Sequence, residues 1–326
     1  MSRPVDDLVE LALGGRRALR RDQVADAVGV PLEEARRLWR AMGFADVGDA
    51  EAFTEQDVAA LRIVDGLMRR GTLDDATAAD LARSLGQTMS RLADWQVDIL
   101  GRRLVERGLL DREAPLSPDS VAAVRDELVD ILPALEQLLV HVWRRQLAAA
   151  VERGLADATA AEEETAYLTV GFADQVGFTR LARRMEESEL AALVERFESR
   201  AADIVVAAGG RVIKTLGDEI LFVAASPRAA ARAGLTLLEA HAADDSFPRL
   251  RIGLATGTVV ARRGDVFGTT VNLASRLTAL ARPDTVLVDE RTALALDAVD
   301  EVALRRHAPR AVRGIGLVRP VELVGL

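Results

Sequence analysis

The hydrophobic pattern of this chain changes about halfway along. Residues 1–157 carry apolar side chains at three- and four-residue spacing in a background rich in Ala, Leu, Arg and Glu, which predicts an all-helical region. One long helix is predicted over about residues 118–156, where a Ser-Pro start is followed by an apolar stripe from Val121 to Val142. Pro133 interrupts this stripe, and we expect it to kink the helix.

After a polar linker at residues 157–166, short β-type runs alternate with helical segments. Strands are predicted at 167–174, 211–215, 219–225, 250–261, 285–290 and 318–326, and helices at 180–209, 231–242 and 271–281. The order of these elements predicts an α+β fold in which helices pack on a mixed, ferredoxin-like sheet. The chain therefore divides into an all-α domain, residues 1–157, and an α+β domain, residues 158–326.

Composition narrows the class of protein. A length of 326 residues suits two domains, and the complete lack of cysteine excludes a disulfide scaffold, a thiolate zinc site and a cysteine nucleophile. No apolar run reaches the ~18–20 residues that a membrane span needs, and the N-terminus is too acidic for a signal peptide. A net charge of -9 argues against nucleic acid as the main partner. We expect a cytoplasmic protein that does not bind membranes.

Candidate chemistry gathers in the second half of the chain. The segment FADQVGFT places Asp174 at the end of a strand, before a glycine turn into a helix. A carboxylate beside helix N-terminal amides suits a metal-bound phosphate, although an aspartate in such a turn also serves as a simple N-cap. The segment KTLGDE places Lys214 and Asp218 on either side of a hairpin, which taken alone fits an ordinary tight turn.

A third segment, DVFGTTVNLASR, completes the set. Asn272 and Arg276 are one helical turn apart and share a helix face, and Asp265 lies in the approach to that helix. Together the three segments offer two aspartates for a metal pair, a lysine and an aspartate for a base edge, and an Asn–Arg pair for phosphate.

The order and spacing of these three segments resemble the catalytic domain of class III nucleotide cyclases, over about residues 166–326. The resemblance implies that Asp174 and Asp218 hold two divalent cations, Mg²⁺ or Mn²⁺, with the backbone carbonyl of Gln175 as a further ligand. It also implies a phosphate-binding turn, which consists of Val176, Gly177, Phe178 and Thr179.

In this family Lys214 and Asp265 match the purine-reading pair of adenylyl cyclases. An aspartate accepts a hydrogen bond from the adenine 6-amino group and a lysine donates to N1, whereas guanylyl cyclases place Glu and Cys there. Lys214 is the single lysine among 42 basic residues; the other 41 are arginines. A compact ammonium group can meet one ring nitrogen, and the planar guanidinium fork of arginine is a poor substitute.

The resemblance also implies the reaction and a partner. Asn272 orients the ribose, Arg276 stabilises charge at the α-phosphate, and Arg251 and Arg313 meet the triphosphate. The ATP 3′-hydroxyl attacks the α-phosphorus and pyrophosphate leaves, giving cyclic AMP. Because the family builds each site between two catalytic domains arranged head to tail, and this chain holds both halves, we expect a homodimer.

The first half of the chain resembles the winged-helix family that includes MerR-type regulators. Residues 15–43 hold seven arginines against four acidic residues, so a DNA-binding transcription regulator with a nucleotide-sensing, cyclase-like domain is the alternative function. The architecture also resembles mycobacterial-type cyclases in which a helical N-terminal domain inhibits catalysis and responds to pH, and we favour this regulatory role. A diguanylate cyclase would need a Gly-Gly-Asp/Glu-Glu-Phe turn, which LGDEI matches poorly.

The long helix of the first half leaves two questions open. Because it leads into the catalytic domain, it either sets how two catalytic domains face each other or serves only as a dimerisation helix. His141 lies near the end of its apolar stripe and is either a solvated side chain or a titrating sensor.

Overall fold

The computed structural model describes residues 4–111, 114, 117–158, 165–244, 246–262, 264–297, 302–312 and 314–324. The contacts divide the chain into two compact units, Met1–Glu152 and Arg153–Leu326. Each unit is described by itself below. The division falls inside a long helix that continues to Ala158. It lies a few residues before the boundary expected at residues 157–158.

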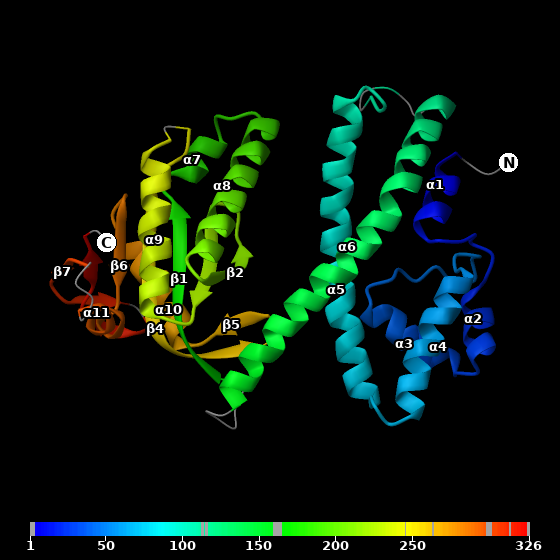
Figure 1. Cartoon of the computed structure of the whole chain (residues 1–326), viewed down its shortest axis with the longest axis horizontal. Coiled ribbons are helices and arrows are strands. Elements are labelled where there is room, and N and C mark those ends of the chain that lie inside the picture. The colour runs from blue at the N-terminus through cyan, green and yellow to red at the C-terminus, as the bar shows by residue number, and fades with distance from the viewer. Residues whose placement is uncertain are drawn as a thin grey trace. The chain divides into compact units, whose positions relative to one another are not determined.

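The first unit is helical. It contains α1 (Pro4–Ala12), α2 (Arg21–Val28), α3 (Leu32–Ala41), α4 (Glu55–Arg69), α5 (Asp75–Glu106) and most of α6 (Pro118–Ala158) (Figure 1). Its core lies between α2, α3, α4 and the start of α5, where the Trp39 and Phe53 rings approach to 4.6 Å between centroids. Thr54 caps α4 as its sequence predicts: the Thr54 amide donates to Asp57 Oδ2 at 2.7 Å, and the Thr54 hydroxyl accepts from the Gln56 amide.

The long helix α6 continues through Pro133, so this proline lies inside the helix and does not end it. Several of its large apolar side chains are exposed, among them Leu138, Trp143 and Leu147. In the described part of the chain, no helix is both long enough and apolar enough to cross a membrane.

The second unit is a mixed sheet with helices on both faces, which confirms the predicted α+β class. The main strands are β1 (Thr165–Gln175), β2 (Gly210–Thr215), β3 (Glu219–Ala224), β4 (Leu250–Arg262) and β6 (Thr285–Val288). The helices are α7 (Phe178–Ala182), α8 (Glu187–Ala207), α9 (Pro227–Ala242), α10 (Thr269–Leu280) and α11 (Glu290–Leu296). The short strands are β5 (Asp265–Phe267), β7 (Leu304–Arg306), β8 (Arg310–Val312), β9 (Gly316–Val318) and β10 (Val321–Leu323).

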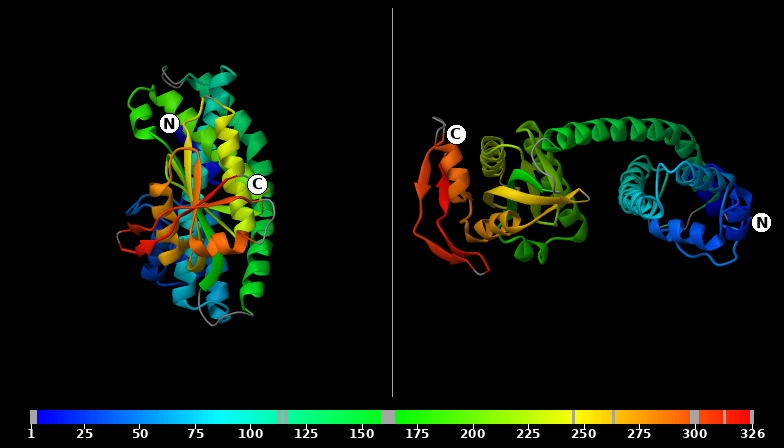
Figure 2. Two further views of the ribbon diagram at one scale, coloured as in Figure 1. Left: turned by 90° about the vertical axis from the view of Figure 1, so that its left-hand side faces the viewer. Right: turned by 90° about the horizontal axis from the view of Figure 1, so that it is seen from below.

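The sheet order is β2-β3-β1-β4-β6-β10-β7, and β5 pairs with β4. Strands β2, β3, β1 and β4 form the antiparallel, ferredoxin-like part, and β6 adds parallel to β4. Helices α8, α9 and α11 cover one face of the sheet and α10 covers the other (Figures 1 and 2). The hydrophobic pattern predicts the strands of the central sheet, whereas α11 and the short strands β5, β7 and β8 are too brief to be recognised from it.

Candidate active site

Two aspartates meet where β1 ends and the β2–β3 hairpin turns. Asp174 lies opposite Glu219 in the antiparallel register of β1 and β3, and the Gln175 amide donates to the Asp218 carbonyl at 2.9 Å. Gly217, in the hairpin, has a φ of 74°, a left-handed conformation that suits glycine. The sheet register thus brings together two aspartates that are 44 positions apart in the sequence.

Arg251 completes this group from the neighbouring strand. It pairs with Asp174 across β1 and β4, and its Nε donates to Asp174 Oδ2 at 2.5 Å. Burial raises the pKa of Asp174; Arg251 opposes this effect, and the charge of Asp218 adds to it. Burial, followed by the charges of Asp174 and Asp218, also raises the pKa of Glu219 to about 7.

These raised pKa values indicate a surplus of desolvated negative charge, which a bound cation would neutralise. The donors are hard carboxylate oxygens, which Mg²⁺ and Mn²⁺ prefer, so the residues present fit a divalent-cation site. Within the described residues, no three His, Cys, Asp or Glu side chains are arranged so that together they could hold one metal ion. The chain therefore provides a carboxylate pair, and Mg²⁺ sites of this kind are typically completed by substrate phosphates and water.

Glu219 is a member of this group that the sequence interpretation passed over. It directly follows Asp218 in KTLGDE, and this adjacency was the only available signal. Gln175 has a buried side chain whose Oε1 and Nε2 have no hydrogen-bond partner. Its predicted role concerns only its backbone carbonyl.

The predicted phosphate-binding turn connects β1 to α7. Gly177 adopts a φ of 79° before α7 begins, which allows the sharp change of direction. The Val176 amide donates to the Arg249 carbonyl at 2.7 Å, and Phe178 packs against the core on the α8–α9 face. The Val176 amide and the Phe178 ring are therefore both engaged within the fold of the single chain.

The two predicted base-reading residues contact each other. Lys214 on β2 donates from Nζ to Asp265 Oδ2 on β5 at 2.6 Å, and the Val266 amide donates to Asp265 Oδ1. Burial raises the pKa of Asp265, but the Lys214 and Val266 hydrogen bonds and the Lys214 charge outweigh burial and lower it overall. Both side chains remain partly accessible, at 37% and 28% exposure, so a ligand can reach them.

Asn272 and Arg276 lie on the exposed side of α10. The opposite side of this helix packs Ala274 and Leu277 against the sheet. The chain therefore presents three separate groups: the carboxylates with Arg251, the Lys214–Asp265 pair, and the Asn272–Arg276 face. Arg313 lies outside the described residues.

The three histidines have different surroundings. His141 is exposed on α6. His241 is buried between the Phe197 and Phe247 rings, and burial lowers its pKa. His307 contacts Glu322 at 2.8 Å.

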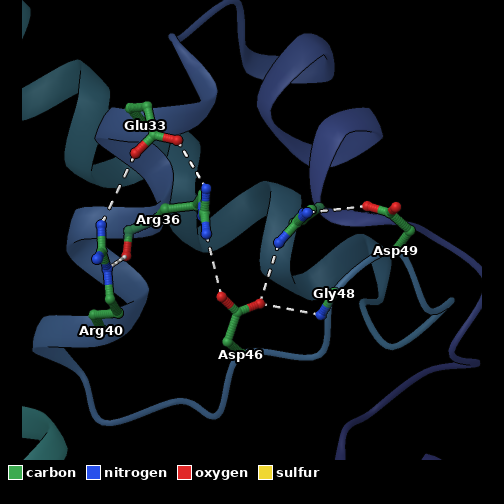
Figure 3. A network of polar contacts seen from close by, with 7 residues as sticks. Glu33, Arg36, Arg40, Asp46, Gly48 and Asp49 are labelled. Carbon is green, nitrogen blue, oxygen red and sulfur yellow. Dashed lines mark hydrogen bonds and ion pairs between the residues drawn. The ribbon is translucent and has the colours of Figure 1, made fainter.

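In the first unit, several arginines of residues 15–43 form ion pairs with carboxylates. Arg36 donates to Glu33 at 2.8 Å and to Asp46 at 3.2 Å, and Arg40 lies 4.0 Å from Glu33 (Figure 3). Arg21 bridges Asp46 and Asp49. These contacts hold the segment between α3 and α4 against helices α2 and α3, and they neutralise much of the local positive charge.

Comparison with known proteins identifies the family of this chain. Residues 160–320 match the adenylate and guanylate cyclase catalytic domain. An adenylate cyclase of Streptomyces coelicolor is 50% identical over 299 residues, which cover 92% of this chain and 75% of the relative. The chain therefore belongs to the class III nucleotide cyclase family.

Two further relatives extend over both units. An adenylate cyclase of Glutamicibacter nicotianae is 42% identical over 335 residues, covering 98% of this chain and 82% of its own length. A pH-sensitive adenylate cyclase of Mycobacterium tuberculosis is 33% identical over 300 residues, covering 90% and 74%. The similarity thus includes the helical first unit as well as the catalytic domain.

Proposed function

We propose that this protein is an adenylyl cyclase that converts ATP to 3′,5′-cyclic AMP and pyrophosphate at a site shared by two copies of the chain. The observation that carries the proposal is the meeting of Asp174 and Asp218, beside Arg251, at one end of the sheet. The names of the relatives that match most of the chain support ATP as the substrate.

In this proposal Asp174 and Asp218 hold two divalent cations, with the Gln175 carbonyl as a further ligand. The bound cations would lower the pKa of the 3′-hydroxyl and neutralise the triphosphate. Lys214 donates to adenine N1 and Asp265 accepts from the 6-amino group. Their mutual ion pair holds both side chains in one region before the base arrives.

Asn272 orients the ribose and Arg276 stabilises the charge that develops at the α-phosphate, an effect of ~10²–10³ in rate for one well-placed donor. Arg251 and Arg313 bind the triphosphate. Asn272 and Arg276 are exposed in the single chain, as expected for residues that complete a site on a second chain. We therefore propose a head-to-tail homodimer with two equivalent sites.

The activity test is incubation of the purified chain with ATP or GTP and Mn²⁺, with mass-spectrometric identification of the cyclic product. We expect cyclic AMP from ATP, loss of product in the Asp174→Asn variant, and little product from GTP. Equal turnover of GTP would contradict the roles of Lys214 and Asp265, and full activity of the variant would contradict the metal site.

The shared site is tested by mixing two inactive chains. Asp174→Ala removes a metal ligand and Lys214→Ala removes a base contact, so a mixed dimer contains one site with neither defect. We expect activity to return on mixing. Absence of rescue, with mixed dimers demonstrated by tagged co-purification, would contradict the shared site.

We also propose that the first unit regulates catalysis, with α6 setting how two catalytic domains face each other. The resemblance to a pH-sensitive cyclase over both units supports pH as the stimulus. The test compares pH–activity profiles of the full chain and of residues 158–326, a cut that falls at the end of α6. Identical profiles and rates would remove the regulatory role.

The alternative, a DNA-binding regulator, finds less support. Arg21, Arg36 and Arg40 are already paired with carboxylates, which reduces the charge available for phosphate contacts. A gel-shift assay with genomic DNA fragments tests this alternative, and sequence-specific shifts at physiological salt would support it.

A further inference from the structure

The ion pair between Arg251 and Asp174 occupies an oxygen that the metal site needs. The two residues are direct neighbours across β1 and β4, and Nε contacts Oδ2 at 2.5 Å. The Asp174 side chain is only 14% exposed, and Arg251 is 36% exposed. The contact is therefore set by the register of two central strands, unlike a chance pairing of flexible surface side chains.

In the nucleotide-free chain, the Arg251–Asp174 ion pair partly neutralises a cluster of carboxyl groups. Asp218 and Glu219 lie next to Asp174 at the end of the β2–β3 hairpin, so three carboxyl groups are close together there. Among the described residues, Arg251 is the basic side chain in contact with this carboxylate group. The Arg251 guanidinium thus supplies positive charge to these carboxyl groups, as a bound metal cation would.

We propose that Arg251 is an internal stand-in cation, which blocks Asp174 until metal and nucleotide arrive together. A divalent cation competes with the guanidinium for Oδ2, and the triphosphate offers the displaced guanidinium a new anionic partner. Metal and nucleotide therefore bind cooperatively, because each favours the state in which the same ion pair is broken. This inference rests on the proposed function, since it takes a triphosphate as the second partner of Arg251.

The test measures Mn²⁺ binding to the nucleotide-free full chain by isothermal titration calorimetry. Removing the competing charge-assisted hydrogen bond in Arg251→Gln should tighten Mn²⁺ binding about tenfold. The matched control is Arg249→Gln, which removes an equal charge two residues away, from an ion pair with Asp284 outside the carboxylate group. We expect its Mn²⁺ affinity to equal that of the wild type.

Two additional measurements guard against a folding defect. Arg251→Lys keeps the charge, so its Mn²⁺ affinity should stay within about threefold of the wild type. In addition, 3′-deoxy-ATP, which lacks the hydroxyl needed for cyclisation, should tighten Mn²⁺ binding more in the wild type than in Arg251→Gln. Circular dichroism on each variant establishes that it is folded.

The outcomes separate this inference from the proposed function. If Asp174→Asn weakens Mn²⁺ binding but a folded Arg251→Gln binds Mn²⁺ no more tightly than the wild type, the stand-in role is wrong and the metal site stands. Equal tightening by Arg249→Gln would likewise overturn it, because the effect would then be one of general charge. If Asp174→Asn leaves Mn²⁺ binding unchanged, the metal site and the inference both fall.

Discussion

Helix α10, which carries Asn272 and Arg276, approaches β4 so closely that only glycine fits at position 253. A Cβ atom placed on Gly253 would lie 2.2 Å from the Thr278 amide nitrogen and 2.5 Å from the Ala274 carbonyl oxygen, both backbone atoms of α10. To restore an ordinary contact of 3.4 Å, the helix must move by about 1.2 Å. No change of rotamer relieves this clash.

Gly253→Ala is therefore expected to reduce both stability and activity. Overpacking of this kind costs about 3 kcal/mol, at the upper end of the usual range, which corresponds to a fall in Tm of roughly 6–12 °C for a unit of this size. A displacement of about 1 Å of the residues that meet substrate reduces kcat/KM by about 10²-fold. Differential scanning calorimetry and an ATP cyclisation assay measure the two effects.

Gly234→Ala is the matched control. Gly234 lies within α9, and a Cβ there would meet Ile252 at 3.5 Å and Val286 at 3.6 Å, which are ordinary van der Waals contacts. Alanine is favoured over glycine in a helix by about 0.8–1 kcal/mol, so this variant should be slightly more stable than the wild type and fully active. Wild-type stability and activity in Gly253→Ala, or equal damage in both variants, would refute the reasoning.

Two further predictions follow from the polar contacts. Lys214→Arg should reduce the preference for ATP over GTP by about tenfold or more in kcat/KM, because a guanidinium fork cannot replace the single ammonium contact; an unchanged preference, measured on both nucleotides, would contradict the base-reading role. The Ser246 hydroxyl, followed by Arg200, lowers the pKa of Asp244 to about 2, so this carboxylate stabilises the fold above its ordinary pKa and the stabilisation is lost as pH falls towards 2. Between pH 4 and 2, the folded fraction measured by circular dichroism should fall less steeply with pH in Asp244→Asn than in the wild type. Identical curves would exclude this contribution.

Local information was sufficient for much of the fold. The cap at Thr54, the long helix α6 and the central strands follow from periodicity and end signals that lie within a few residues of one another. Short elements such as β5 and α11 carry too few residues for a period to be recognised, and they form because neighbouring strands and helices hold them in place.

The amino-acid sequence by itself determined the candidate residues of the site, because their types and their order along the chain are local properties. Only the tertiary structure decided which of these residues touch. The strand register places Arg251 on Asp174 across 77 positions, and the fold of the sheet brings Lys214 on β2 to Asp265 on β5 across 51. Likewise, the charge of the arginine-rich segment in the first unit depended on carboxylates contributed by a neighbouring loop. Electrostatic pairing depends on distance in space, which spacing along the chain does not encode.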